Sequence, residues 1–382
     1  MDSSPSDAPD LVPTAVPVAV PPPIVLPPPD SPSPGELGLQ LLGAGIGGWC
    51  CSQWGVPVAW LLGPLAVGVL LALVRGRSRP LPAGLVNLGR SLLALVAASR
   101  FSVETIGFAA TYALPLMLCI ALASALSLMN GYLLWRWADL DRSTAFLSSI
   151  PGASFGMVAM SEEMGADAMA VTVLQYLRVL LVATLVPNLA TLLFQTEGAE
   201  VARSLLVASP TTPLVLALIP VWMVSGIMIG QKLRLPAGSF LGTLLVALGT
   251  FWLLPQPVTI PTPLFLLGLL VVGLSIGLRF HRSALQTLAK AVLVDTGLIL
   301  VLILCCLGIA YGFHGLTHIS TMTAVLGFTP GGLEAMVATV MELGGDTSVV
   351  LAMQMTRMFA LLLLGPGLVA WLVNRPDRAT VD

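Results

Sequence analysis

The chain has very few charged residues for its length: 17 Lys and Arg and 19 Asp and Glu among 382 residues, or 9% of the sequence. Soluble domains carry roughly 25% charged residues, because a globular surface must be covered with polar groups. A soluble enzyme and a disordered protein are therefore excluded. The net charge of -2 lacks the basic excess typical of nucleic-acid binding, so no nucleic-acid partner is expected.

Cysteine and histidine are also scarce. The five cysteines lie in apolar runs, and two pairs are adjacent in sequence, which is not the spacing of a disulfide framework or a zinc site. His314 and His318 have the i, i+4 spacing of metal ligands on a helix. However, Gly315 and Thr317 between them favour a solvated loop. We therefore expect no metal and no cofactor, and the sequence has no phosphate loop, dinucleotide fingerprint or nucleophile elbow that would indicate an enzyme.

Apolar residues dominate instead. They make up 56% of the chain, and the mean hydropathy is +0.94. A helical protein that crosses the membrane many times is the class that needs about 20 apolar residues per element. The segments predicted to cross, each 17 residues or longer, are 37–53, 56–74, 85–101, 107–134, 168–194, 211–230, 237–254, 262–280, 291–313 and 347–371.

Residues 1–36 differ from the rest of the chain. This stretch holds 12 of the 30 prolines, five acidic residues and no Lys or Arg. Such a density of proline favours extended backbone and predicts a disordered tail. The predicted organisation is this tail, a first membrane unit at 37–205, a second at 206–375 and a C-terminal tail at 376–382.

The two membrane units are copies of each other. Residues 145–187 align with 324–366 without a gap, at a constant offset of 179, and the same offset pairs Gly89 with Gly268. The identities in the aligned segment include Pro151/Pro330, Gly152/Gly331, Glu163/Glu342, Gly165/Gly344, Asp167/Asp346, Gln175/Gln354, Arg178/Arg357 and Pro187/Pro366.

The distribution of Lys and Arg predicts how the copies face. If the Pro-Gly segments 145–163 and 324–342 enter and return on one side, thirteen Lys and Arg lie inside and two outside. If every segment crosses, the count is nine to six. We therefore predict an all-α polytopic membrane protein with two inverted repeats of five transmembrane helices, each with a Pro-Gly re-entrant half-helix. Both termini are expected on the cytoplasmic side of the cell inner membrane.

The half-helices begin at Pro151-Gly152 and Pro330-Gly331, and proline is favoured at the first position of a helix. From Pro151 to Glu163 is 13 residues, or about 20 Å of helix, too short for a bilayer core of about 30 Å. Free N–H groups near mid-membrane carry a partial positive charge, and many secondary transporters build their substrate site in this way. A proline-kinked full span without a ligand is the alternative.

The helix that follows each half-helix places Gln175 and Arg178, with Asp167, on one face, at about 80°, 20° and 0°. Arg178 lies 11 residues beyond Asp167, or roughly 16 Å deeper in the membrane. An arginine at that depth is costly, so it should face a protein interior or a wet cavity. Two roles stay open: anion binding, or hydrogen bonding to carbonyls of the re-entrant element. The predicted substrate-binding residues are Pro151, Gly152, Gln175, Arg178, Pro330, Gly331, Gln354 and Arg357.

Acidic residues near these segments are candidates for ion coupling. Two pairs with i, i+4 spacing are expected near a membrane surface, where ordering the turn and capping the next helix is an alternative role. The candidates are Glu163, Asp167, Glu334, Glu342 and Asp346.

Two acidic residues stand apart from these pairs. Glu334 has no acidic counterpart, since Phe155 takes its place in the first copy. It is either a proton-coupling group or a partner that neutralises Arg357. Asp295 is expected to form a local pair with Lys290.

These motifs resemble the AbrB-type integral membrane family, whose members have a duplicated membrane unit. The shared features are a P-G-x-x-x-x-M-V-A core, an E-x-G-x-D turn and a Q-x-x-R helix, each present twice within about 40–372. The first copy departs with Pro-Gly-Ala-Ser where the second has Pro-Gly-Gly-Leu-Glu. The resemblance implies labels such as regulator of gene expression and ammonia monooxygenase, but three histidines suit no copper oxygenase and no DNA-binding domain is evident.

The sequence therefore predicts a secondary transporter of a small solute, with an anion favoured by the arginines. The alternative is a membrane sensor that binds a solute and affects gene expression indirectly through a partner. The expected partners are that solute and the lipid bilayer, and a homo-oligomer remains open beside a monomer.

Overall fold

The computed structural model describes residues 32–75, 79–101, 107, 111–151, 157, 161, 164–194, 213–235, 237–253, 258–280 and 282–373. Within these residues the secondary structure is entirely helical, as the composition predicts. The helices are α1 (Pro34–Gln53), α2 (Ala59–Arg75), α3 (Ala83–Arg100), α5 (Ala113–Trp137), α6 (Arg142–Ser149), α8 (Ala168–Leu193), α10 (Pro213–Lys232), α11 (Gly238–Phe251), α12 (Thr262–Gly277), α13 (Arg282–Thr287), α14 (Ala289–Thr317), α15 (Thr321–Phe328), α16 (Leu333–Leu343) and α17 (Thr347–Val373).

Four helices in the described part of the chain are long and apolar enough to cross a membrane: α5, α8, α10 and α14. Large apolar side chains such as Leu118, Leu214 and Leu304 are exposed on α5, α10 and α14, which suits contact with lipid rather than water. Three further apolar helices, α2, α11 and α12, have 10–17 residues. The membrane class is therefore supported, and the count of ten spans stays a prediction.

The segment 324–342 contains two helices, α15 and α16, separated at Pro330, so a helix begins three residues after the predicted start at Pro330. One local prediction was wrong. His314 lies inside α14 rather than in a loop, because that helix continues to Thr317, and His318 is its left-handed C-cap at φ 57°. The short helix α13 was not predicted.

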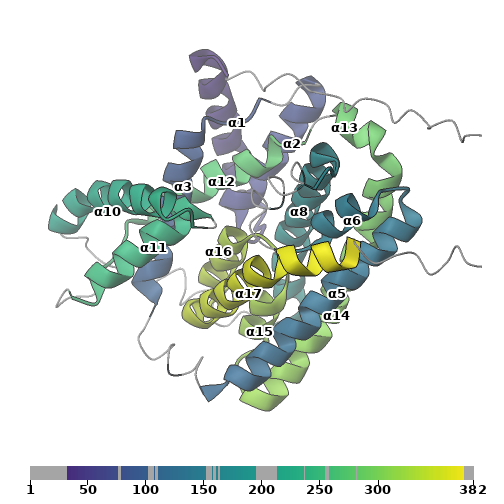
Figure 1. Cartoon of the computed structure of the whole chain (residues 1–382). Helices are drawn as coiled ribbons and strands as arrows, with labels where there is room; N and C mark the ends of the chain where they lie inside the picture. Colours follow the sequence, from purple (N-terminus) through teal and green to yellow (C-terminus); the bar gives the residue numbers. More distant parts are fainter. Residues whose placement is uncertain are drawn as a thin grey trace, which may run out of the picture.

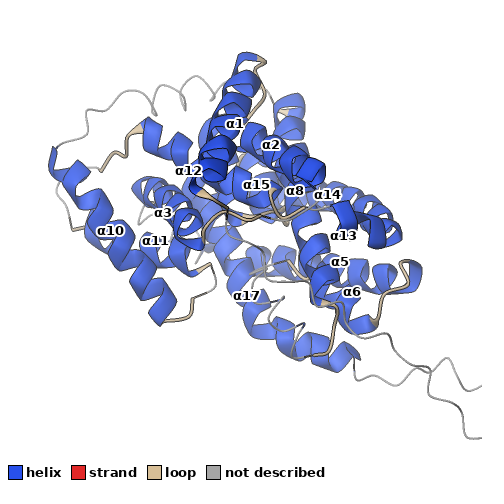
Figure 2. Cartoon of the chain, turned by 90° about the horizontal axis from the view of Figure 1, so that it is seen from above, coloured by secondary structure: helices blue, strands red, loops and turns tan. Residues whose placement is uncertain are grey.

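The helices form two groups that meet along the middle of the molecule. In the first, α1 packs on α2, α2 on α12, α12 on α3, α3 on α11, and α11 on α10. In the second, α5 and α14 lie along each other, and α6, α8, α15 and α17 pack around them. Figure 1 places α10 and α11 at one end and α5 with α14 at the other, and the view from above in Figure 2 keeps this order.

Glycines allow the first group to pack with its helix backbones nearly touching. A Cβ on Gly63 of α2 would lie 2.4 Å from the carbonyl carbon of Gly47 on α1. The matching pair in the second copy is Gly242 of α11 and Gly226 of α10, where the added carbon would lie 2.1 Å from the Gly226 oxygen. The glycine-rich run 43–48 thus serves close helix packing, as small residues do in membrane helices.

We expect Gly242→Ala to destabilise the protein by about 1–3 kcal/mol, because its methyl group would overlap the backbone of α10 and force the helices apart. The matched control is Gly249→Ala on the same helix, where an added Cβ would meet nothing within 4 Å. The control should be neutral or slightly stabilising, since alanine favours helix. Thermal unfolding of both variants in detergent measures the difference, and equal melting temperatures would contradict the packing account.

Candidate functional site

Two helices in the centre of the protein end at prolines. Helix α6 ends at Ser149 and the chain becomes extended at Ile150, just before Pro151. Helix α15 ends at Phe328 and the chain becomes extended at Thr329, just before Pro330. In a continuous helix the prolines would donate hydrogen bonds to carbonyls four residues earlier, but proline has no N–H. Each break therefore leaves buried carbonyl groups that need other donors.

Side chains of α8 supply those donors in the first copy. The amide nitrogen of Gln175 donates to Leu147 O at 2.7 Å, which is the acceptor that Pro151 leaves unpaired, and to Ile150 O at 3.0 Å. The Arg178 guanidinium donates to Ser149 O at 2.8 Å and to Ile150 O at 3.2 Å. It also donates to the side-chain oxygen of Gln175, so the two side chains hold each other in place.

The same contacts recur in the second copy at an offset of 179 residues. Gln354 donates to Leu326 O at 2.7 Å and to Thr329 O at 3.2 Å. Arg357 donates to Phe328 O at 2.9 Å and Thr329 O at 3.1 Å, and to the Gln354 side chain at 2.6 Å. We call each arrangement a Gln–Arg clamp: Gln175 with Arg178, and Gln354 with Arg357. Of the two roles predicted for the arginines, hydrogen bonding to the backbone at the breaks is the one these contacts fit.

Both breaks open onto one pocket of about 590 Å³ between the two helix groups. Among the predicted binding residues, Gln175 does not line the pocket but accepts a hydrogen bond from Arg178, which does. Gly152 lies outside the described residues. A Cβ on Gly331 would meet Val182 of α8 at 2.6 Å, so glycine lets the start of α16 approach α8. The remaining predicted binding residues all line the pocket: Pro151, Arg178, Pro330, Gly331, Gln354 and Arg357.

Positive charge dominates the described lining of this pocket. Four arginines, Arg90, Arg178, Arg234 and Arg357, face one carboxylate, that of Glu334. The first turn of α16 also faces the pocket, and its N-cap Gly332 has no side chain with which to cap the free N–H groups. A helix start of this kind adds a partial positive charge. The pocket is therefore suited to an anion.

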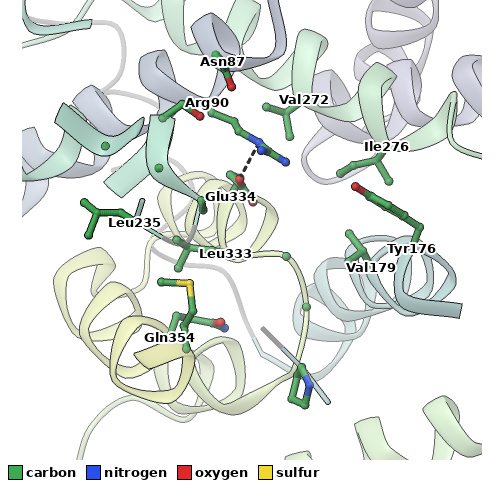
Figure 3. Close-up of a pocket in the computed structure, with 18 of the residues that line it drawn as sticks. Asn87, Arg90, Tyr176, Val179, Leu235, Val272, Ile276, Leu333, Glu334 and Gln354 are labelled. Atoms are coloured by element: carbon green, nitrogen blue, oxygen red, sulfur yellow. Dashed lines mark ion pairs between the residues drawn. The ribbon is translucent and has the colours of Figure 1, made fainter. Parts of the chain in front are cut away.

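Glu334 pairs with Arg90 and not with Arg357, the partner in one of the two roles that the sequence left open for it. Oε1 of Glu334 lies 3.2 Å from Nε of Arg90, and the two side chains are 13% and 18% exposed. Figure 3 shows the side chains reaching toward each other from α16 and α3 across the pocket. Because α3 belongs to the first helix group and α16 packs in the second, the ion pair bridges the two groups.

Three other predicted carboxylates, those of Asp167, Glu342 and Asp346, do not line the pocket. Asp167 caps α8 by accepting from Met169 and Ala170 N–H, and Asp346 caps α17 by accepting from Val349 N–H. These contacts fit the capping alternative.

Each acidic pair also contains a glutamate, Glu163 in the first copy and Glu342 in the second. Glu342 does not cap a helix but accepts a hydrogen bond from Val58 N–H at 3.0 Å, and so ties the end of α16 to the start of α2. Glu163, its counterpart in the first copy, lies outside the described residues.

Asp295 is buried rather than interfacial, which corrects another expectation. It is 4% exposed on α14, which packs against α8, the helix that carries Arg178. Lys290 pairs instead with Asp139, which precedes α6. The helix of the Arg178 clamp thus has a buried acidic residue on a neighbouring helix.

Sequence reasoning missed most of the pocket wall from the first helix group. Arg90 is one of the thirteen Lys and Arg that the inverted arrangement puts on the cytoplasmic side, yet it lies within α3 and lines the pocket beside Asn87. Arg234, after α10, and Tyr176, on α8, also line it. One signal was available, because a charged residue inside an apolar segment such as 85–101 is rare without a function.

Comparisons with known proteins place the chain in a family. The family described as "Transition state regulatory protein AbrB" matches residues 12–373. A protein of Escherichia coli K12 named "Putative regulator AbrB" is 32% identical over 316 residues, covering 82% of this chain and 89% of its own. "Uncharacterized protein YhjN" of Bacillus subtilis 168 is 27% identical over 352 residues, covering 84% and 88%. No solved structure matches the chain.

Arg178→Lys and Arg357→Lys should each lower the stability of the protein by about 1–3 kcal/mol. The two terminal nitrogens of the arginine fork bond different acceptors, and the single nitrogen of a shorter lysine side chain cannot occupy both positions, so a buried acceptor loses its donor. Arg282→Lys, at an exposed position on α13, is the control for the chemical change itself. Melting temperatures in detergent test this, and clamp variants that melt with the control would contradict the assigned hydrogen bonds.

Proposed function

The chain belongs to the AbrB family, and from this membership we propose that it is a secondary transporter of a small anionic solute. The observation that carries the proposal is the pocket of about 590 Å³ onto which both helix breaks open. Broken helices around a shared central pocket are how many secondary transporters form a site that is reachable from either side. The excess of arginine over carboxylate in the pocket supports an anion as the cargo. The chain carries the solute without changing it chemically.

Two inverted copies of one five-span unit are the proposed membrane architecture. The recurrence of the clamp contacts at an offset of 179 supports the duplication. The contacts between helices are reciprocal, since α2 packs on α12 and the matching α11 packs on α3. Gly89 and Gly268 are matching residues that also approach each other, as expected where an axis relates the copies.

The ion pair between Asp139 and Lys290 supports the inverted orientation. A parallel arrangement would put the loops 136–142 and 282–290 on opposite sides of the membrane, and these two residues could not meet. Moving Arg90 and Arg234 from the cytoplasmic set to the pocket changes the charge count from thirteen to eleven, still against two. We accordingly propose that both termini lie in the cytoplasm and that the protein resides in the cell inner membrane.

Among the candidate coupling groups, Glu334 has the position that coupling requires. It lies in the pocket, whereas Asp167 and Asp346 cap helices at the edge of the membrane region and Glu342 bonds to Val58. A carboxylate beside the solute can change its protonation or its partner when the solute binds.

A solute sensor is the second candidate function, and the name of the Escherichia coli relative, a regulator, is the observation that favours it. A sensor would use the same pocket, but it would pass the binding signal to a partner and move no solute across the membrane. Both functions predict binding, so only net movement separates them.

Proteoliposomes that contain only this protein should accumulate a radiolabelled anionic solute, and uptake should fall at least tenfold when Arg357 is replaced by Gln. Loss of the arginine removes a positive charge from the pocket and releases the break at Pro330. The amount of folded protein in each vesicle preparation is the control. Tight binding of a solute that never enters the vesicles would contradict transport and identify a sensor.

Single cysteines at positions 79, 139 and 283 of a cysteine-free variant should be protected from an impermeant thiol reagent in intact cells. All three should react once the cells are permeabilised, because the inverted arrangement puts these loops in the cytoplasm. Ser52→Cys is the positive control, since Ser52 is exposed at the end of α1 on the opposite side. Labelling of position 283 in intact cells would contradict inverted repeats.

A further inference from the structure

Arg90 differs from the two clamp arginines in what it holds. Arg178 and Arg357 donate to backbone carbonyls at the helix breaks, and they are 4% and 5% exposed. Arg90 forms an ion pair with a side chain, that of Glu334, and both members of the pair line the pocket. A side-chain partner can be exchanged without breaking a helix, whereas a backbone partner cannot.

We propose that Arg90 is the residue that binds the anionic group of the solute, and that the solute takes the place of Glu334, which binds a proton as it leaves. This inference rests on the proposed anion pocket and names its binding residue and its coupling ion. In the empty protein the Glu334 carboxylate neutralises Arg90. In the loaded protein a proton neutralises Glu334, and the anion neutralises Arg90. One proton and one monoanion enter together, so the step moves no net charge.

Charge in a poorly solvated pocket explains why the two events are linked. If Glu334 stayed ionised beside the bound anion, two negative charges would share the guanidinium of Arg90, and their repulsion would oppose binding. The groups that face Glu334 are Arg90 from α3, Arg178 and Tyr176 from α8, Arg234 from the turn after α10 and Arg357 from α17. Arginine and tyrosine do not normally titrate between pH 5 and 8. Helix α15 carries no titratable residue. Among the described residues that line the pocket, Glu334 is therefore the group that accepts the proton.

The remaining wall points to a solute with an apolar part. Val179, Val272, Ile276, Leu333 and Met358 line the pocket with the arginines. An apolar wall with a few charged groups is the usual form of a site for a small organic ligand. A guanidinium binds a carboxylate through two parallel hydrogen bonds, which suits Arg90 to this group. The solute class is therefore a small organic carboxylate.

The duplicated chain offers an internal comparison. Position 155, which matches Glu334 at the offset of 179, is a phenylalanine, and position 269, which matches Arg90, is Leu269. Both members of the ion pair thus differ from their counterparts in the other copy, whereas the clamp residues are the same in both copies. Two residues that both lack a charged counterpart and that contact each other indicate a role that only one site in the protein performs.

Calorimetric titration of the purified protein with benzoate, which stays ionised between pH 5.5 and 7.5, tests the exchange. In buffers of different ionisation enthalpy the wild type should take up about one proton per benzoate bound. Its affinity should rise as the pH falls. Glu334→Gln should bind benzoate at least tenfold more tightly at pH 7.5, with no proton uptake and no pH dependence. Arg90→Lys should bind at least tenfold more weakly, and adding it to Glu334→Gln should abolish the gain.

Arg79→Gln is the matched control, because it removes an arginine–glutamate pair, that with Glu36, outside the pocket. It should leave benzoate binding unchanged, and melting temperatures verify that every variant is folded. Equal benzoate affinity in wild type and Glu334→Gln, or proton uptake that persists in Glu334→Gln, would overturn the exchange. Sulfate provides a second arm, and tighter binding of sulfate than of benzoate would overturn the organic carboxylate assignment.

The outcomes also separate this inference from transport itself. If the variants behave as expected but vesicles accumulate no benzoate, the exchange stands and the transporter proposal fails. If vesicles accumulate benzoate and neither substitution alters binding, transport stands and the roles of Arg90 and Glu334 are wrong.

Discussion

Two prolines impose the constraint on which the rest of this structure depends. Pro151 and Pro330 remove a helical hydrogen bond where no water is at hand to replace it, and an unpaired backbone carbonyl in such a place is costly. The clamp glutamines donate hydrogen bonds to the two carbonyls that the prolines cannot bond, Leu147 O and Leu326 O. The clamp arginines satisfy the next carbonyls along. These four side chains stabilise the two helix breaks inside the membrane region.

This constraint also explains the position of the charge. An arginine that must reach the end of a broken helix is carried to the centre of the protein, and both arginines reach the same pocket because the two breaks face each other there. The clamps therefore give the pocket a fixed positive charge as a consequence of holding the backbone. Arg90 adds a guanidinium on the opposite wall, and its pairing with Glu334 brings the two helix groups into contact across the pocket. In the proposed function the clamp arginines contribute charge to the pocket while their hydrogen bonds hold the backbone, and the hydrogen bonds to the solute come from Arg90.

Much of the region around the two helix breaks could be predicted from the sequence, because its residues recur in both copies of the repeat. The repeated Pro-Gly pairs located the breaks, and the Gln and Arg on one helix face were singled out as central residues. Hydrogen bonding of the arginines to the backbone was one of the two roles that the sequence left open. Features without a second copy were predicted poorly. Lys290 and Asp295 were expected to pair, but five residues along a helix place them about 140° apart. Lys290 pairs instead with Asp139, from the segment between α5 and α6, and Asp295 is buried on α14, which packs against α8.

Glu334 shows the same limit. Its partner is Arg90, 244 positions away in the sequence, and no spacing rule joins α3 to α16. The resemblance to the AbrB family located the repeat, yet it could not indicate which face of α3 meets the pocket. Tertiary packing decides that face, and the close glycine contacts of α2, α3, α11 and α12 set it.

The central claim is that two clamped helix breaks enclose an anion pocket. A cryo-electron microscopy map of the protein in lipid nanodiscs with 4-iodobenzoate tests it most directly, because iodine scatters strongly. The account predicts iodine density between the start of α16 and α8, with both clamps on their carbonyls. A continuous helix through Pro330, or iodine bound away from the pocket, would contradict it.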